Sequence, residues 1–227
     1  MSDSPDIADA YRRGRVQFLG LDILTTQGVL VPRIETELLA NAALDLLRDS
    51  DAEQVRVIDV CCGAGNLACA LAYNAPHARI WACDITDDCA KLACRNIELH
   101  GLAERVSVHQ GDLFSPLDGM GLEGTIDVIV CNPPYISEKR LEEDRARLLD
   151  WEPRVAFAAG PYGLAIHTRV IRDAVAFLRP AGVLLVEVGL GQDRQVELLF
   201  ERTRAYQKIK IATNAAGEGR VVIGWSK

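Results

Sequence analysis

The chain repeats one short pattern four times: an apolar, β-branched segment followed closely by glycine, aspartate or asparagine. The segments cover residues 55–60, 79–83, 106–109 and 126–131. Short apolar runs separated by helical stretches are typical of strands buried between two layers of helices. Parallel strands present their carboxyl ends at one edge of a sheet, where open α/β sheets bind their ligands. The pattern therefore predicts a doubly wound α/β domain with a binding site along that edge.

A turn with two consecutive prolines follows the last of these segments, and it reads Asn132-Pro133-Pro134-Tyr135. Proline donates no backbone hydrogen bond, so the strand must end there in a rigid turn at the ligand edge. The turn offers an amide oxygen, backbone carbonyls and an aromatic ring. These groups suit a planar –NH2 group, such as an amide or an aminopurine, although a plain Pro-Pro loop would read the same.

The first two segments end in residues that suit a nucleoside. Gly63 and Gly65 follow the first strand and allow a ligand to approach the backbone closely, and Asp59 points toward the same space. Asp84 ends the second strand about 20 residues beyond the glycines, which is the usual spacing for a carboxylate that binds ribose hydroxyls. The two segments together predict a site for the sugar of a nucleoside.

The third segment adds a possible purine contact. Asp112 can accept a hydrogen bond from an exocyclic amine, and Leu113 or Phe114 can lie against the ring. The glycine turn lacks the G-x-x-x-x-G-K-[ST] sequence of triphosphate sites and the full G-x-G-x-x-G of dinucleotide sites. Each acid alone would also fit a solvated strand end. The residues expected to bind the cofactor are Asp59, Cys61, Gly63, Gly65, Asp84, Ile85, Asp112, Leu113 and Asn132.

The ordered set of motifs resembles that of class I S-adenosylmethionine (SAM) methyltransferases, and in particular the HemK-like family of release-factor glutamine N5-methyltransferases. It extends over roughly residues 28–227 and is carried by residues 29–37, 59–65, 132–135, 152–154, 160–164 and 182–189. The resemblance implies a Rossmann-like sheet of seven mostly parallel strands that ends in an antiparallel hairpin. It also implies SAM as the cofactor.

The resemblance assigns roles to individual residues. Asp84 would hold the SAM ribose and Asp112 the adenine amine. The turn that contains Asn132, Pro133 and Tyr135 would bind the glutamine amide. From the chemistry of an amide we expect these residues to act by positioning and electrostatics, with no obligate general base. The residues expected to bind substrate are Arg33, Glu35, Thr36 and Pro134, although residues 31–37 also read as an ordinary helix start.

The chain departs from the family pattern in three places. Cys61 stands where the glycine turn usually has its first glycine, and a positive φ there would strain the backbone. Ile166 and His167 lie in a segment that usually carries an aromatic residue. Only about 28 residues precede the resemblance, whereas bacterial members of the family have a helical N-terminal domain that helps to bind the release factor.

A length of 227 residues suits one α/β core. Residues 1–50 are expected to form an N-terminal arm, and residues 51–227 the methyltransferase domain. Within the arm, residues 16–24 and 29–31 read as a small hairpin. An amphipathic helix is expected over residues 35–48.

Net charge and cysteine content indicate which classes of partner the protein binds and in which compartment it occurs. The net charge of −7 argues against a nucleic-acid substrate. The seven cysteines contain no C-x-x-C pair, so reduced, packed thiols and no metal site are expected. The chain contains no apolar run of about 18 residues, the length that would span a membrane, and its polar start is unlike a signal peptide. These features predict a cytoplasmic protein.

Three functions stay open from the sequence. The first is SAM-dependent N-methylation of a planar amide, on a glutamine-bearing loop of a protein. The second is N-methylation of a small molecule in specialised metabolism. The third is a binding or regulatory protein, or another SAM-consuming enzyme that performs a carbon-centred transfer or a cyclisation. The Asn132–Tyr135 turn favours the first two, while Cys61 and the segment at Ile166 keep the third open.

Overall fold

The computed structural model describes residues 7–136, 152 and 163–227, and these residues form two sheets. The strands of the larger sheet are β3 Val55–Val60, β4 Ala78–Asp84, β5 Val106–Gln110, β6 Ile126–Cys131, β7 Leu178–Glu187, β8 Tyr206–Thr213 and β9 Gly219–Ser226. Their order in the sheet is β5-β4-β3-β6-β7-β9-β8. The first five are parallel, and β9 is antiparallel to both of its neighbours. The structure confirms the predicted sheet and its closing hairpin.

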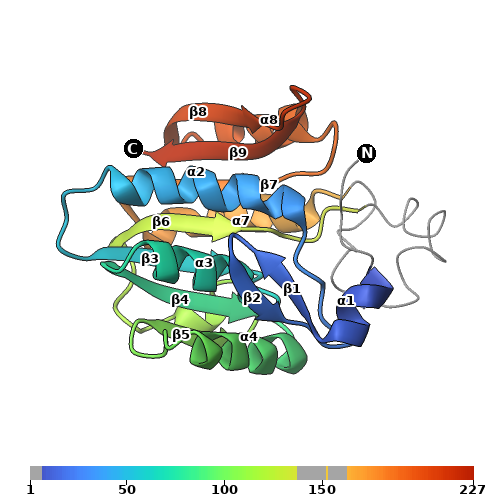
Figure 1. Ribbon diagram of the computed structural model, residues 1–227. Helices are drawn as coiled ribbons and strands as arrows, with labels where there is room; N and C mark the ends of the chain where they lie inside the picture. Colours follow the sequence, from blue (N-terminus) through green and yellow to red (C-terminus); the bar gives the residue numbers. More distant parts are fainter. Residues whose placement is uncertain (1–6, 137–151, 153–162) are drawn as a thin grey trace.

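Helices cover both faces of this sheet (Figure 1). One face carries α2 Glu37–Arg48, α3 Asn66–Asn74 and α4 Asp87–Leu99. The other carries α7 Ala165–Phe177 and α8 Asp193–Thr203. The described apolar side chains divide into two cores, one on each side of the sheet. Two short 3-10 helices, η1 Ile34–Thr36 and η2 Ser115–Leu117, lie at the start of α2 and after β5.

The N-terminal region begins with α1 Ile7–Arg13, followed by a hairpin of β1 Arg15–Phe18 and β2 Leu21–Leu24. The hairpin predicted from residues 16–24 and 29–31 is wrong in its pairing, because the turn falls at Leu19 and Gly20, inside the first predicted strand. Both turn residues have positive φ, +45° and +80°, as type I′ hairpin turns require. Leucine is unusual in such a turn, which is why residues 16–24 read as a single strand.

Asn96 joins the hairpin to the helix that follows β4. Its Oδ1 accepts from the Leu24 backbone N–H at 2.7 Å, and its Nδ2 donates to the carbonyls of Leu24 at 3.3 Å and Ala64 at 2.9 Å. Asn96 is fully buried, so these bonds are shielded from water. They connect the arm, α4 and the turn after β3.

Among the helices of the described residues, none is both long enough and apolar enough to cross a membrane.

Candidate functional site

A cavity of about 210 Å³ lies where the parallel strands end. Its walls come from the turns after β3, β4 and β6, from the loop after β5 and from α7. The structure brings most of the expected cofactor residues to its lining: Cys61, Gly63, Asp84, Ile85, Asp112, Leu113 and Asn132. Pro134, expected to bind substrate, also lines it. The cavity therefore joins the candidate nucleoside residues to the Asn-Pro-Pro-Tyr turn.

Asp84 braces the glycine turn from the neighbouring strand. Its Oδ2 accepts from the Gly63 backbone N–H at 2.9 Å, and its Oδ1 accepts from the Thr86 backbone N–H at 3.2 Å. Thr86 in turn caps α4 through a bond from the Cys89 N–H at 3.2 Å. A methyl group added to Gly63 would meet no atom within 4 Å. Space is therefore open for a ligand directly against this backbone.

The departure at Cys61 falls on a backbone conformation that glycine would favour. Cys61 has φ of +59°, which costs a non-glycine residue on the order of 1–2 kcal/mol. Gly65, four residues later, has φ of +76°, and a Cβ there would lie 3.0 Å from the Cβ of Ala93. The loop thus tolerates a small side chain at 61, which faces the cavity, and none at 65, which packs against α4.

Asp59 lies behind the glycine turn, outside the cavity lining. It is fully buried, and its Oδ2 accepts from the Ala68 backbone N–H at 3.0 Å, while its Oδ1 has no hydrogen-bond partner among the described residues. Burial raises the pKa of Asp59 to about 8, the bond from Ala68 lowers it, and the charge of Asp84 raises it further. Asp59 therefore anchors the start of α3 to the strand β3.

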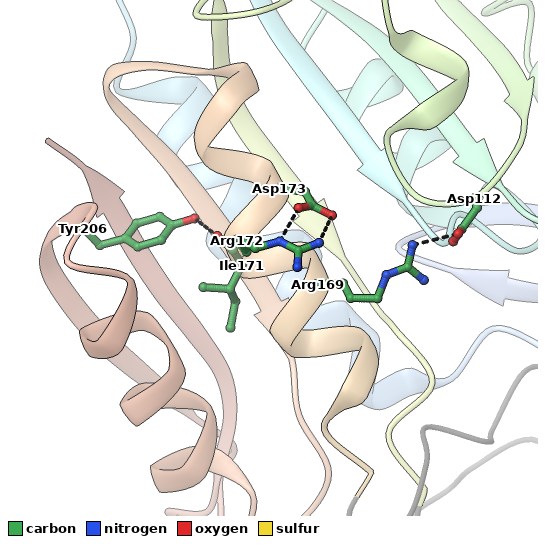
Figure 2. A network of polar contacts seen from close by, with 6 residues as sticks. All are labelled: Asp112, Arg169, Ile171, Arg172, Asp173 and Tyr206. Carbon is green, nitrogen blue, oxygen red and sulfur yellow. Dashed lines mark hydrogen bonds and ion pairs between the residues drawn. The ribbon is translucent and has the colours of Figure 1, made fainter.

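The structure distinguishes the two residues proposed to contact a purine. Leu113 lines the cavity, whereas Phe114 is buried and stacks on Phe177 with ring centroids 5.0 Å apart. Figure 2 shows Asp112 facing Arg169 of α7, and the Arg169 Nη2 lies 2.7 Å from the Asp112 Oδ2. Hydrogen bonding to Asp112 raises the pKa of Arg169. One carboxylate oxygen of Asp112 is thus held by Arg169, and the other is left for a ligand.

The Asn-Pro-Pro-Tyr turn is held from behind by buried polar residues. Asn132 Nδ2 donates to Thr36 Oγ1 at 3.1 Å, and Thr36 is only 2% exposed. The Tyr135 hydroxyl donates to Glu187 Oε1 at 3.4 Å, and Arg220 Nη2 lies 3.7 Å from the same oxygen. Thr36, expected to bind substrate, therefore contacts the turn itself.

Glu187 is the central group of this buried set. Burial raises its pKa to about 7, while hydrogen bonding from Thr36 and the charge of Arg220 lower it. Glu35 raises this pKa through its own charge, and the Tyr135 hydroxyl lowers it.

His167, fully buried in α7, donates from Nε2 to the Glu187 backbone carbonyl at 2.9 Å, so it is a packed core residue.

Arg33 pairs with a residue far along the chain. Its Nη2 lies 2.5 Å from Glu152 Oε2, and Glu152 Oε1 accepts from the Val31 backbone N–H at 2.9 Å. Glu152 thus binds the N-terminal arm from a position more than 100 residues away. Burial raises the pKa of Glu152, and Arg33 lowers it. The remaining motif residues at 153–154 and 160–162 are outside the described part of the chain.

Sequence reasoning missed part of the cavity wall: Leu30, Cys83, Thr86, Cys89, Ile166 and Arg169. Thr86 is the N-cap of α4, and Cys89 lies in the first turn of that helix. Arg169 and Ile166 lie on α7, which joins the wall only after the sheet is assembled. The helical periodicity of residues 165–177 does not predict that α7 lines a cavity. It indicates which side of the helix is apolar, and not which part of the protein the start of the helix contacts.

The cavity fits the nucleoside part of a cofactor. The carboxylates of Asp84 and Asp112 lie at successive strand ends, an arrangement that suits ribose hydroxyls and an exocyclic amine. Leu113 supplies an apolar wall, and the open space in front of Gly63 lets a ligand approach the backbone. Among the described residues, no group of three or more His, Cys, Asp or Glu side chains could hold a metal ion.

A family model and the sequence relatives of this chain agree on one protein family. The methyltransferase small domain family matches residues 34–149. A release factor glutamine methyltransferase of Moorella thermoacetica is 35% identical over 217 residues, which are 96% of this chain and 74% of the relative. A ribosomal protein uL3 glutamine methyltransferase of Bradyrhizobium diazoefficiens is 35% identical over 194 residues, 81% of this chain and 58% of the relative.

A solved structure agrees with the sequence relatives. The crystal structure of a release-factor-specific protein-(glutamine-N5) methyltransferase from Alicyclobacillus acidocaldarius superposes with a TM-score of 0.53 at 25% identity, covering 87% of this chain and 94% of that one. These findings confirm the resemblance drawn from the motifs. The chain belongs to the family of release factor glutamine methyltransferases, and it is a methyltransferase enzyme.

Proposed function

We propose that the enzyme transfers a methyl group from SAM to the side-chain amide nitrogen of a glutamine in a protein. One observation carries this proposal: Asn132 and Pro134 line the same cavity as Asp84 and Asp112. A group that can accept N–H bonds is therefore next to a site suited to a nucleoside. The names of the relatives agree with this reaction.

The cofactor end would hold SAM through its nucleoside. When bound, SAM supplies a methyl group on a positively charged sulfur, ready for in-line displacement. Asp84 would accept hydrogen bonds from the ribose hydroxyls, and the free oxygen of Asp112 would accept one from the adenine amine. Leu113 would pack against the purine. These contacts fix the cofactor without chemical participation of the protein.

The acceptor end would hold the amide. An amide nitrogen is a poor nucleophile because its lone pair is delocalised. Asn132 Oδ1 and the Pro133 carbonyl would accept the two amide N–H bonds, which fixes the nitrogen and favours the positive charge that develops on it. Tyr135 would pack against the amide plane, and Arg33, Glu35 and the arm around them would contact the polypeptide that carries it. No general base is needed before methyl transfer. The S–CH3 bond of SAM would break as the N–CH3 bond forms, S-adenosylhomocysteine would leave, and the methylated nitrogen would lose its extra proton to water.

The acceptor is expected to be a protein. The relatives are named for two proteins, a release factor and ribosomal protein uL3, and both carry the glutamine to be methylated. All seven cysteines are free thiols, which supports a cytoplasmic location, where such substrates occur.

The test is methyl transfer from isotopically labelled SAM into an extract of the source cell, separated into protein, nucleic-acid and small-molecule fractions. The expected result is label in a protein band, followed by peptide mapping to a glutamine that has gained one methyl group. Purified release factor and uL3 then decide between the two acceptors. Label confined to small molecules or to nucleic acid would overturn the protein assignment.

A further inference from the structure

The side chain of Gln192 joins the start of α8 to the Asn-Pro-Pro-Tyr turn. Its Nε2 donates to the Tyr135 backbone carbonyl at 2.9 Å, and its Oε1 accepts from the Gly189 backbone N–H at 3.0 Å. A backbone carbonyl accepts and a backbone N–H donates, so these two partners fix the orientation of the amide. Gln192 is also the N-cap residue of α8, but its side chain makes no capping hydrogen bond. The side chain therefore holds the turn and not the helix.

The Gln192 amide lies in a slot between two glycines. A Cβ on Gly189 would lie 2.7 Å from Gln192 Oε1, and a Cβ on Gly163 would lie 2.8 Å from Gln192 Nε2. Real Cβ atoms essentially never come so close to another atom. Gly189 is not among the glycines with positive φ, so the close approach of the amide, and not the backbone conformation, explains why a side chain would not fit there.

Tyr135 is held at three places by the residues that follow the buried part of β7. Its carbonyl accepts from Gln192, and its hydroxyl donates to Glu187 Oε1 at 3.4 Å. Its ring packs against Gly189, because a Cβ on that glycine would lie 3.1 Å from Tyr135 Cδ2. Of these three contacts, the bond from Gln192 is the one that holds the backbone of Tyr135.

The other end of the turn is held by different partners. Cys131 pairs with Val186 in the sheet, and Asn132 Nδ2 donates to Thr36 Oγ1 at 3.1 Å. Between the two ends lie two prolines, whose rings fix φ. The turn is thus rigid in its middle and anchored at both ends, and loss of the bond from Gln192 would free one end.

We propose that Gln192 is a positioning residue of the acceptor site, which holds the end of the turn so that the Pro133 carbonyl and the Tyr135 ring keep their places against the substrate amide. Gln192 is not among the residues that line the cavity, so it acts through the turn. The inference rests on the proposed function and deepens it, because it names a residue that keeps the acceptor site in shape. A displacement of about 1 Å at a reacting centre can lower a rate by about a hundredfold.

The experiment replaces Gln192 with methionine, which keeps the length of the side chain but has no N–H donor and only a weak acceptor. We expect kcat with the purified protein acceptor to fall about tenfold to a hundredfold, with the affinity for S-adenosylhomocysteine within about twofold of wild type. The matched control is Gln207→Met, because Gln207 Nε2 donates to the Ser226 carbonyl at 2.8 Å in the hairpin of β8 and β9. That variant should keep the wild-type rate.

A second measurement reports the position of Tyr135 without any acceptor. The chain has five tyrosines, so the NMR spectrum of enzyme that carries ¹³C-labelled tyrosine has few signals, and Tyr135→Phe identifies the signal of Tyr135. We expect this signal to shift in Gln192→Met and to keep its wild-type position in Gln207→Met. Gln192→Asn should also shift it, because the shorter side chain retains the amide but cannot reach both partners.

The outcomes separate the two proposals. A wild-type kcat in Gln192→Met, or an unmoved Tyr135 signal in that variant, would overturn the positioning role. An equal loss of kcat in Gln207→Met would also overturn it, since the effect would then reflect general destabilisation. Absence of protein methylation by the wild-type enzyme would instead contradict the proposed function, and the Tyr135 signal would still show whether Gln192 holds the turn.

Discussion

The two ends of the cavity are built from different kinds of contact. At the proposed cofactor end, the ion pair at the rim is partly exposed: the side chains of Arg169 and Asp112 are 41% and 47% accessible. At the acceptor end, Thr36 and Glu187 are almost completely buried. An exposed ion pair is screened by water and contributes little, whereas buried polar groups depend strongly on every partner. Substitutions at the acceptor end should therefore affect catalysis far more than those at the cofactor rim affect binding.

The largest effect is expected from Asn132→Ala. It removes the acceptor for the substrate N–H group, so kcat should fall by about a hundredfold to a thousandfold, as when a preorganised group in an active site is deleted. S-adenosylhomocysteine affinity, measured by calorimetry, should stay near the wild-type value. Asn74→Ala serves as the control, since the Asn74 side chain donates to the Ala70 carbonyl within its own helix, α3. Equal loss of kcat and of S-adenosylhomocysteine affinity would show that Asn132 does not act at the acceptor end alone, contrary to the proposed division of the cavity.

Asp84→Asn tests the buried part of the cofactor end. The Asp84 carboxylate accepts at both oxygens, from Gly63 and from Thr86, whereas an asparagine side chain accepts at only one. We expect S-adenosylhomocysteine affinity to fall about tenfold to a hundredfold, with kcat at saturating SAM much less affected. Asp87→Asn is the control, because Asp87 is exposed and pairs with Lys91 in the first turn of α4. An unchanged affinity would show that the Asp84 carboxylate does not contribute to cofactor binding.

Asp59→Asn tests the carboxyl group behind the glycine turn through pH. Burial raises the Asp59 pKa from its unfolded value to about 8. Its stabilising contribution is therefore complete below the unfolded pKa and is lost as pH rises through about 8. Asparagine resembles the neutral form and does not titrate. The melting temperature of the variant relative to wild type should rise between pH 5 and pH 9, as followed by calorimetry.

The exposed Asp118→Asn variant controls for the removal of one surface charge in the same pH series. If the difference between Asp59→Asn and wild type stays constant with pH, the pKa of Asp59 in the folded protein is not raised above its unfolded value. Such a result would mean that the region behind the glycine turn is more hydrated than its full burial indicates.

The smallest effect is expected from Arg169→Gln at the rim. Loss of a half-exposed ion pair changes a free energy by roughly 1 kcal/mol or less, so S-adenosylhomocysteine affinity should fall by no more than about fivefold. Arg172→Gln is a closely matched control, because Arg172 lies on the same helix and pairs with the adjacent Asp173 (Figure 2). A loss as large as that of Asp84→Asn would show that the rim is as critical as the buried contacts.

Much of the fold was predictable because its signals are local. The parallel strands are short β-branched runs, and Thr86 caps α4 as threonine often does. The hairpin near the N-terminus was misread because Leu19 adopts a turn conformation that leucine rarely takes. The sequence predicted backbone strain at Cys61 only if its φ were positive, and the φ of +59° meets that condition.

The sequence alone determined the order of strands and helices, the family and the residues at the strand ends, because each depends on neighbours a few positions away. Only the tertiary structure decided that Thr36 contacts Asn132, that Glu152 pairs with Arg33 and that Arg169 faces Asp112. These partners are separated by 96, 119 and 57 positions. No local pattern encodes such pairs, because they meet only when the sheet brings its strand ends to a common edge.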